Sequence, residues 1–437
     1  DEGQQVTPHR AEPRHEDTPQ RAGLPRQAGP EAAGMPPTIT SVKIVTPPPQ
    51  PAAEQAQEAR PADQPRPAEQ PRPAEQPGRP GRLAPAVTRR RLLAGLGGLG
   101  AVGLAVAGWE LSQGGGPAPG TEIWSSGAGG GPVGALAVAG GVVFFSARTG
   151  RLYALRASDG ATMWSSGLGG GVVTGPAAAG GVVYFGGHDN RVYALHAATG
   201  RRIWSSGVGG WVATDPVAGD GVVYVGGGNT VLYALRAADG RPSWSRPIGG
   251  GPVSDPAVAG GVIYIGGQNV STLFALRATD GRPLRAIPVS GGWFTGPAVS
   301  GGVIYIGGGV TTLNALRAPG GQPIWARPVG VRGFPLPAVA DGVVYVSGDD
   351  GRLHALHASH GAPAWSSPAG GGPATGPVAA GGVVYFGGRD GRLHALAAAD
   401  GTQAWTFALA GGAGPAPVLA GGVLYAAGRT RLYALHA

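Results

Sequence analysis

The chain of 437 residues contains no cysteine, which excludes disulfide bonds and thiolate metal sites. Its formal net charge is +8, from 33 lysines and arginines against 25 aspartates and glutamates. Most of these arginines recur at fixed positions of a sequence repeat, without the single basic face and interleaved aromatic residues that are typical of nucleic-acid binding. We therefore expect no nucleic-acid partner.

The first region, residues 1–87, is rich in Pro, Gln, Glu and Ala and contains the stretch RPAEQPRPAEQPGRPGR. Such a composition buries too little apolar surface to offset the loss of chain entropy on folding, and its prolines favour an extended coil. It predicts a disordered linker.

The second region, residues 88–110, begins with TRRR and continues with 18 uncharged residues, 92–109. As a helix these residues would extend about 27 Å, close to the roughly 30 Å hydrocarbon core of a bilayer. The preceding arginines predict a single-pass membrane anchor with a cytoplasmic N-terminus. A twin-arginine-like export signal, cut after Ala105-Val106-Ala107, is the alternative. Both interpretations place residues 120–437 outside the cytoplasm.

The third region, residues 120–437, repeats with a period of 40 residues that is stretched once to 41. Each repeat has four short segments, as in GPAAAGG, GVVYFGG, RVYALHA and TGRRIWSSG. Alternating Val, Ile and Tyr bounded by glycines predict β-strands joined by hairpins. Four strands in a 40-residue repeat are typical of one blade of an all-β propeller.

Eight segments of the VVY type predict eight four-stranded antiparallel blades. The last repeat ends with RLYALHA and lacks its fourth strand, whereas residues 121–127, TEIWSSG, form a fourth strand without a blade. We therefore expect this N-terminal strand to complete the eighth blade and to close the ring.

A tryptophan closes almost every repeat, and Arg285 takes the one missing position. A large flat side chain is suited to fill the contact between neighbouring blades. The predicted blade-docking tryptophans are Trp124, Trp164, Trp204, Trp244, Trp325, Trp365 and Trp405. Glycines such as Gly160 and Gly200 fall in the preceding turn, where we expect a positive φ.

The motif ALHAATGRRIW and its copies resemble the tryptophan-docking repeat of the eight-bladed, quinoprotein-type propellers named after pyrroloquinoline quinone (PQQ). The resemblance covers residues 120–437 and implies the fold. The family includes PQQ-dependent dehydrogenases, an outer-membrane assembly scaffold, and the extracytoplasmic sensor halves of bacterial transmembrane serine/threonine kinases. Similar dehydrogenases carry an adjacent cysteine pair and a calcium ion, and this chain has no cysteine. We therefore expect no cofactor, no catalytic residue and no enzyme activity here, while a kinase domain upstream of Asp1 stays open.

Histidines do not predict a metal site. His354 and His394 occupy the repeat position that Tyr153 and Tyr193 fill in other blades. Equivalence within the repeat accounts for them, and we expect no metal.

Residues that break the repeat predict a binding site. They fall in the connections between blades, at one end of the expected ring, where most blades carry glycine. The candidates for the mouth of the central funnel are Trp211, Asp215, Asp255, Trp293, Phe294, Arg332 and Phe334. Aromatic, guanidinium and carboxylate groups together suit a polar ligand or a peptide. The alternative is that they fill gaps and cap turns, since Asp before Pro commonly starts a turn.

Three functional hypotheses follow from these patterns. The first is an extracytoplasmic sensor propeller on a single-pass anchor, which binds a protein, a peptide or a small polar ligand. The second is an assembly scaffold of the cell envelope that needs no small ligand. The third is a PQQ-dependent dehydrogenase, which the missing cysteine pair disfavours.

Overall fold

The computed structural model of the protein describes residues 117–437, apart from 168–169, 173, 250–253, 267–270, 290–295, 309–311, 330–336 and 349. The predicted linker and the predicted anchor lie outside the described residues. Among the residues that are described, none belongs to a helix that is long and apolar enough to cross a bilayer. These residues form strands and tight turns, with two short 3-10 turns at Ala128–Gly130 and Ala369–Gly371.

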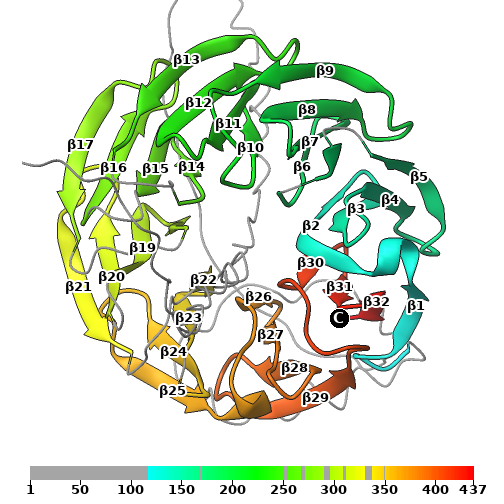
Figure 1. The fold of residues 1–437 in the computed structure, drawn as a ribbon. Coiled ribbons are helices and arrows are strands. Elements are labelled where there is room, and N and C mark those ends of the chain that lie inside the picture. The colour runs from blue at the N-terminus through cyan, green and yellow to red at the C-terminus, as the bar shows by residue number, and fades with distance from the viewer. Residues whose placement is uncertain are drawn as a thin grey trace, which may run out of the picture. The chain divides into compact units, whose positions relative to one another are not determined.

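The strands form eight four-stranded antiparallel sheets, which confirms the predicted eight-bladed propeller (Figure 1). The inner strands are β2 (Pro132–Ala139), β6 (Ala177–Ala179), β10 (Val217–Gly219), β14 (Ala257–Ala259), β18 (Ala298–Ser300), β22 (Pro337–Ala340), β26 (Val378–Ala380) and β30 (Val418–Ala420). The second strands are β3 (Val142–Ala147), β7 (Val182–Gly186), β11 (Val222–Gly226), β15 (Val262–Gly266), β19 (Val303–Gly308), β23 (Val343–Ser347), β27 (Val383–Gly387) and β31 (Val423–Ala427). The third strands are β4 (Leu152–Arg156), β8 (Arg191–His196), β12 (Val231–Arg236), β16 (Thr272–Arg277), β20 (Thr312–Arg317), β24 (Leu353–His357), β28 (Arg392–Ala397) and β32 (Leu432–His436). The outer strands are β5 (Thr162–Ser166), β9 (Arg202–Gly207), β13 (Pro242–Pro247), β17 (Pro283–Pro288), β21 (Pro323–Pro328), β25 (Pro363–Ser367), β29 (Gln403–Ala408) and β1 (Glu122–Ser126).

Blades are numbered one to eight in chain order from β2, so blade eight consists of β30, β31, β32 and β1. The two ends of the ring differ. One end, here the turn end, holds the turns between strands one and two and between strands three and four; the N–H of Ala157 joins them by donating to the Gly141 carbonyl at 2.9 Å. The other, the connection end, holds the hairpins between strands two and three and the segments that lead from one blade to the next.

Each blade buries both faces of its two middle strands. Val143 on β3 and Leu155 on β4 are fully buried, although they belong to a sheet of only four strands. Their alternating neighbours Phe144 and Ala154 are fully buried on the opposite face. A four-stranded sheet reaches this state only between two other sheets, which explains why the repeats close into a ring.

Tryptophans of the outer strands contact the next blade. The Nε1 of Trp204 in blade two donates to the Ala237 carbonyl of blade three at 2.8 Å, and its ring lies over Gly240. Gly240 has a φ of +71°, and an added Cβ would lie 2.5 Å from the indole. Glycine is therefore required there for both its conformation and its missing side chain. The same indole-to-carbonyl bond recurs from Trp124, Trp164, Trp244, Trp325 and Trp365, at 2.8–3.1 Å.

Blade four lacks the tryptophan and uses a different side chain. Arg285 pairs with Ala275 in the sheet and is exposed, whereas Ile287, two residues later, is 2% exposed. Ile287 lies over the turn glycine of blade five, because a Cβ added to Gly321 would meet its Cδ1 at 2.4 Å. An isoleucine thus replaces the indole at this contact.

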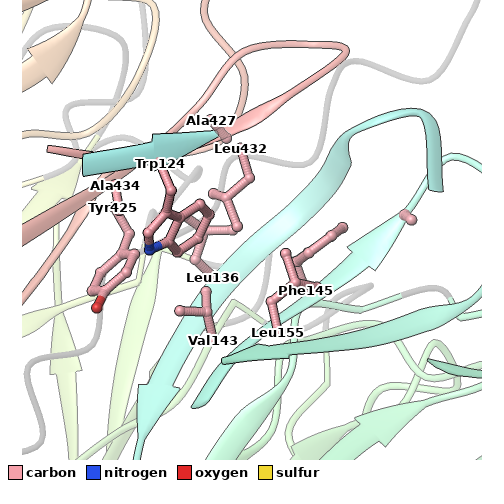
Figure 2. Packing of buried hydrophobic residues seen from close by; sticks show 10 residues of the cluster. Trp124, Leu136, Val143, Phe145, Leu155, Tyr425, Ala427, Leu432 and Ala434 are labelled. Carbon is pink, nitrogen blue, oxygen red and sulfur yellow. The ribbon is translucent and has the colours of Figure 1, made fainter. Parts of the chain in front are cut away.

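The ring closes through β1, as predicted. β1 pairs antiparallel with β32, with Trp124 opposite Ala434 and Ser126 opposite Leu432. Figure 2 shows the Trp124 ring beside Tyr425 of blade eight and Leu136 of blade one, and the Trp124 and Tyr425 ring centres are 6.0 Å apart. Two segments far apart in the chain therefore share the core between blades eight and one.

Candidate functional site

The sequence candidates Asp215 and Asp255 lie directly before the inner strands β10 and β14. The preceding residues fix the backbone there: the hydroxyl of Thr214 accepts a hydrogen bond from the Gly226 N–H at 2.8 Å. The hydroxyl of Ser254 accepts the equivalent bond from Gly266 at 3.1 Å. Each aspartate is thus held at the entrance of its blade.

The two aspartates bridge three consecutive blades. Oδ1 of Asp215 accepts a hydrogen bond of 2.7 Å from the backbone N–H of Gly175 in the preceding blade. Oδ1 of Asp255 in turn accepts a bond of 3.0 Å from the backbone N–H of Asp215. Asp215 is buried, with 7% of its surface exposed. A hydrogen bond to a charged acceptor is shorter and stronger than one between neutral groups, so this carboxylate braces its neighbour.

The packing around Gly175 leaves no room for a side chain. A Cβ on Gly175 would lie 2.5 Å from the Cβ of Ala135 in blade one and 2.9 Å from Oδ2 of Asp215. We conclude that the aspartates join blades at this end of the ring. This role corresponds to the capping interpretation of the sequence, but the capped N–H groups belong to the preceding blade.

Of the candidates that the structure describes, Trp211 is the most exposed, with 49% of its surface exposed. Its carbonyl accepts a hydrogen bond of 2.7 Å from the Gly228 N–H, and Val212 bridges to Gly227. The indole lies against Gly228, where an added Cβ would lie 1.9 Å from Nε1. Trp211 is thus an exposed aromatic side chain on a fixed backbone at the connection end.

Neighbouring polar side chains support the Trp211 segment. Asn229 donates to the hydroxyl of Tyr233 at 2.7 Å, and that hydroxyl accepts a bond of 2.9 Å from the Gly209 N–H. The residues before Trp211 therefore rest on the hairpin of the same blade.

The remaining candidates, Trp293, Phe294, Arg332 and Phe334, lie outside the described residues. Of the candidates that are described, the structure brings together Asp215 and Asp255. Trp211 shares a connection with Asp215 and projects to the surface.

A second polar feature, which the sequence analysis missed, recurs in the hairpins of the connection end. Asp189 accepts a hydrogen bond from the Tyr193 hydroxyl, and Asp390 lies 3.0 Å from Nε2 of His394. Burial raises the pKa of Tyr193, and the hydrogen bond and negative charge of Asp189 act in the same direction. The sequence does contain a pattern that could have predicted these pairs: an acidic residue lies four positions before the Tyr or His of the third strand. These pairs fasten the hairpins to the sheet.

The described residues do not fit a calcium–quinone cofactor. Within them, no three His, Asp or Glu side chains gather closely enough to hold a metal ion. Asp215 and Asp255 direct their Oδ1 atoms to backbone N–H groups of the propeller.

Comparison with known proteins identifies the family. The family model described as outer membrane protein assembly factor BamB matches residues 116–210, 188–286, 275–379 and 366–437. The chain belongs to this family. The four matches of the BamB family model together cover the whole propeller, and the first three each span more than two of its repeats. No curated protein matches the chain.

Solved structures share the fold at low sequence identity. BamB from Moraxella catarrhalis is 16% identical, with a TM-score of 0.62 over 72% of this chain and 99% of that chain. The computationally designed Ika8 protein is 14% identical, with a TM-score of 0.65 over 73% and 100%. Quinohemoprotein alcohol dehydrogenase from Comamonas testosteroni is 18% identical, with a TM-score of 0.59 over 72% and 76%. The fold is thus similar to that of both an assembly factor and an enzyme.

Proposed function

We propose that the propeller is a protein-binding scaffold held outside the cytoplasm by a single-pass anchor, residues 92–109. The observation that carries the protein-binding part is Trp211, which is 49% exposed at the connection end. Tryptophan is enriched among the residues that dominate the energy of protein interfaces.

The setting of Trp211 favours a protein over a small ligand. The described carboxylate nearest to it in the sequence, Asp215, is committed to a contact between blades through the Gly175 N–H. An exposed indole on a fixed backbone loses little conformational freedom when a partner covers it. The match to the BamB family model supports the same reading, since its description names an assembly factor.

The anchor part of the proposal rests on the sequence. Three arginines precede 18 uncharged residues, and the first described strand begins at Glu122, shortly after them. The order of linker, anchor and propeller also supports a finer role as a sensor, similar to the sensor halves of transmembrane kinases. In either role the propeller binds a partner and carries out no reaction itself.

The partner is sought with a photoreactive amino acid placed at position 211 of the full chain in its native envelope. We expect a discrete crosslinked protein from position 211 and none from position 324. Ile324 is the matched control, because it is 37% exposed but lies on the outer strand β21. With the purified partner, Trp211→Ala is expected to weaken binding at least about tenfold, and Ile324→Ala to leave it unchanged.

Two results would contradict the proposal. Equal crosslinking from positions 211 and 324 would remove Trp211 as the contact. A rise in melting temperature with PQQ and calcium, without any crosslinked partner, would favour the dehydrogenase. The topology is tested separately with His188→Cys, an exposed site in a chain without cysteine: an impermeant maleimide should label it in intact cells.

A further inference from the structure

The turn end of the propeller has an uneven distribution of charge. In blades two to five it carries seven exposed arginines, which we call the basic arc, against the three aspartates Asp220, Asp239 and Asp280. The basic arc consists of Arg201, Arg202, Arg236, Arg241, Arg277, Arg282 and Arg317. The equivalent positions of blades six, seven, eight and one carry one arginine, Arg156, and four carboxylates. The carboxylates are Glu122, Asp159, Asp341 and Asp400.

Ion pairs within the arc leave arginines in excess. Asp239 lies 2.6 Å from Arg236 and 3.9 Å from Arg241, so two cations share one carboxylate. Asp280 is placed in the same way between Arg277 and Arg282, at 3.1 and 3.5 Å. The arc therefore has a net charge of +4, from seven arginines and three aspartates, whereas the opposite half of the turn end has −3, from one arginine and four carboxylates.

The chain enters the propeller at this same turn end. The N–H of Gly120 donates to the His436 carbonyl at 2.7 Å, which places Gly120 in the last turn of blade eight. Ten residues, 110–119, separate it from the proposed anchor. Ten residues reach at most about 36 Å even when fully extended. A short tether of this kind keeps the turn end toward the bilayer.

The point where the described chain enters the ring and the basic arc lie on opposite sides of the ring. Figure 1 shows β1, where the chain enters, across the ring from β17 of blade four, which is within the arc. A ring held at one edge by its anchor and at the other by charge would lie flat on the membrane.

We propose that the basic arc docks the turn end on anionic phospholipid headgroups, with the connection end and Trp211 facing away from the membrane. The inference rests on the anchor of the proposed function. The planar guanidinium group matches the geometry of phosphate oxygens, and the contact depends on ionic strength because charges more than about 10 Å apart are screened at 0.1 M salt. The positive charge of the basic arc would also attract an acidic protein. We favour the lipid because the short segment after the proposed anchor keeps the turn end near the membrane.

The absence of cysteine allows a direct test with the full chain in vesicles. A donor dye is attached at Ala198→Cys, exposed at the turn end of blade two, or at His188→Cys, exposed at its connection end. The six residues of β8 separate the two ends by about 20 Å. Energy transfer to a headgroup-labelled lipid is compared between vesicles of phosphatidylcholine with phosphatidylglycerol and vesicles of phosphatidylcholine alone.

We expect phosphatidylglycerol to raise energy transfer from position 198 and not from position 188. Replacing Arg201, Arg241 and Arg282 together by Gln should remove this increase, as should high salt. With about a fivefold effect for each arginine near an anionic surface, the triple variant should shift the docking equilibrium about a hundredfold. The matched control replaces Arg151, Arg392 and Arg431 by Gln, three exposed arginines of the connection end, and should keep the increase.

The outcomes separate this inference from the proposed anchor. In one outcome the chain stays in the vesicles through an alkaline wash, as the anchor predicts. If energy transfer is then equal in the two kinds of vesicle, or if the two triple variants have equal effects on it, only the docking inference is overturned. The arc would then face an acidic protein or a second copy of the chain. Removal of the chain from both kinds of vesicle by alkaline washing overturns the anchor and this orientation together.

Discussion

The N–H of Gly120 donates to the carbonyl of His436 at 2.7 Å, across the point where the ring closes. Gly160 makes the same bond to Arg156 within the continuous chain of blade one, at 2.8 Å. The two ends of the propeller thus rebuild a turn that the other blades form from one segment. Trp405 of blade seven packs on Gly120 in the way that Trp124 packs on Gly160.

This contact predicts that Gly120→Ala destabilises the propeller more than Gly421→Ala. Both glycines have positive φ, +80° and +57°, so each substitution costs about 1–2 kcal/mol of backbone strain. Only at Gly120 would the new Cβ meet an indole, at 2.7 Å, whereas Gly421 has open space. Overpacking adds about 1–3 kcal/mol, measurable by denaturant unfolding. Equal losses would show that Trp405 does not press on the closing turn.

Blade four predicts that Ile287→Ala lowers the free energy of unfolding by about 2–5 kcal/mol, because a fully buried isoleucine leaves a cavity. Ile324→Ala, at an exposed position of β21, should change it by less than about 0.5 kcal/mol. Thermal and denaturant unfolding of the two variants measure the difference. A mild effect at Ile287 would mean that Arg285, and not Ile287, supports the contact with blade five.

The brace between blades predicts that Asp215→Ala destabilises the protein by about 1–3 kcal/mol, the cost of leaving a buried donor, the Gly175 N–H, without its acceptor. Asp215→Asn retains a side-chain oxygen at the same place and should lose less. Denaturant unfolding of both variants tests this order. If Asp215→Ala were as stable as the native chain, the carboxylate would be available for a ligand instead.

Buried tyrosines predict a loss of stability in alkali. Burial raises the pKa of one tyrosine in each of seven blades above its ordinary value of 10.0: Tyr184, Tyr224, Tyr264, Tyr305, Tyr345, Tyr385 and Tyr425. Below pH 10 both folded and unfolded chains keep these protons, so the stabilisation is complete. Above it the unfolded chain loses protons first, so stability falls as the pH rises toward the folded pKa values.

The measurement is the melting temperature between pH 8 and pH 12, together with tyrosinate absorbance. Tyr264→Phe should reduce the slope above pH 10 because it removes one of the seven hydroxyls, and Tyr264 is 1% exposed. Ionisation of all tyrosines near pH 10 while the protein remains folded would contradict the prediction.

The fold was readable in the sequence because every blade repeats the same local signals. Trp204, Ala237 and Gly240 recur at fixed spacings, and these spacings are the contacts between blades. The burial of the seven blade-docking tryptophans differs from blade to blade. Trp124, Trp204 and Trp325 are buried, whereas the other four are half-buried, since the outer strands lie at the edge of the ring.

The candidate site was harder to predict from the sequence. Asp215 and Asp255 were identified as candidates because they replace glycine in two consecutive repeats. The sequence does not indicate that their hydrogen-bond partners are backbone N–H groups of the preceding blade. That choice depends on how closely the entrances of neighbouring blades approach. The role of Ile287 could not be predicted from the sequence either, because Arg285 occupies the repeat position at which the other blades have a tryptophan.

Closure by β1 also sets the order of assembly. Ser125 accepts a hydrogen bond from Arg431, 306 residues later in the chain, so the ribosome makes one partner long before the other. Blades one to seven each pair strands that are neighbours in the chain, whereas the pairing of β1 with β32 waits for residues 432–436. Until β32 is made, β1 lacks its strand partner, and an unpaired strand edge is a template on which another chain can pair.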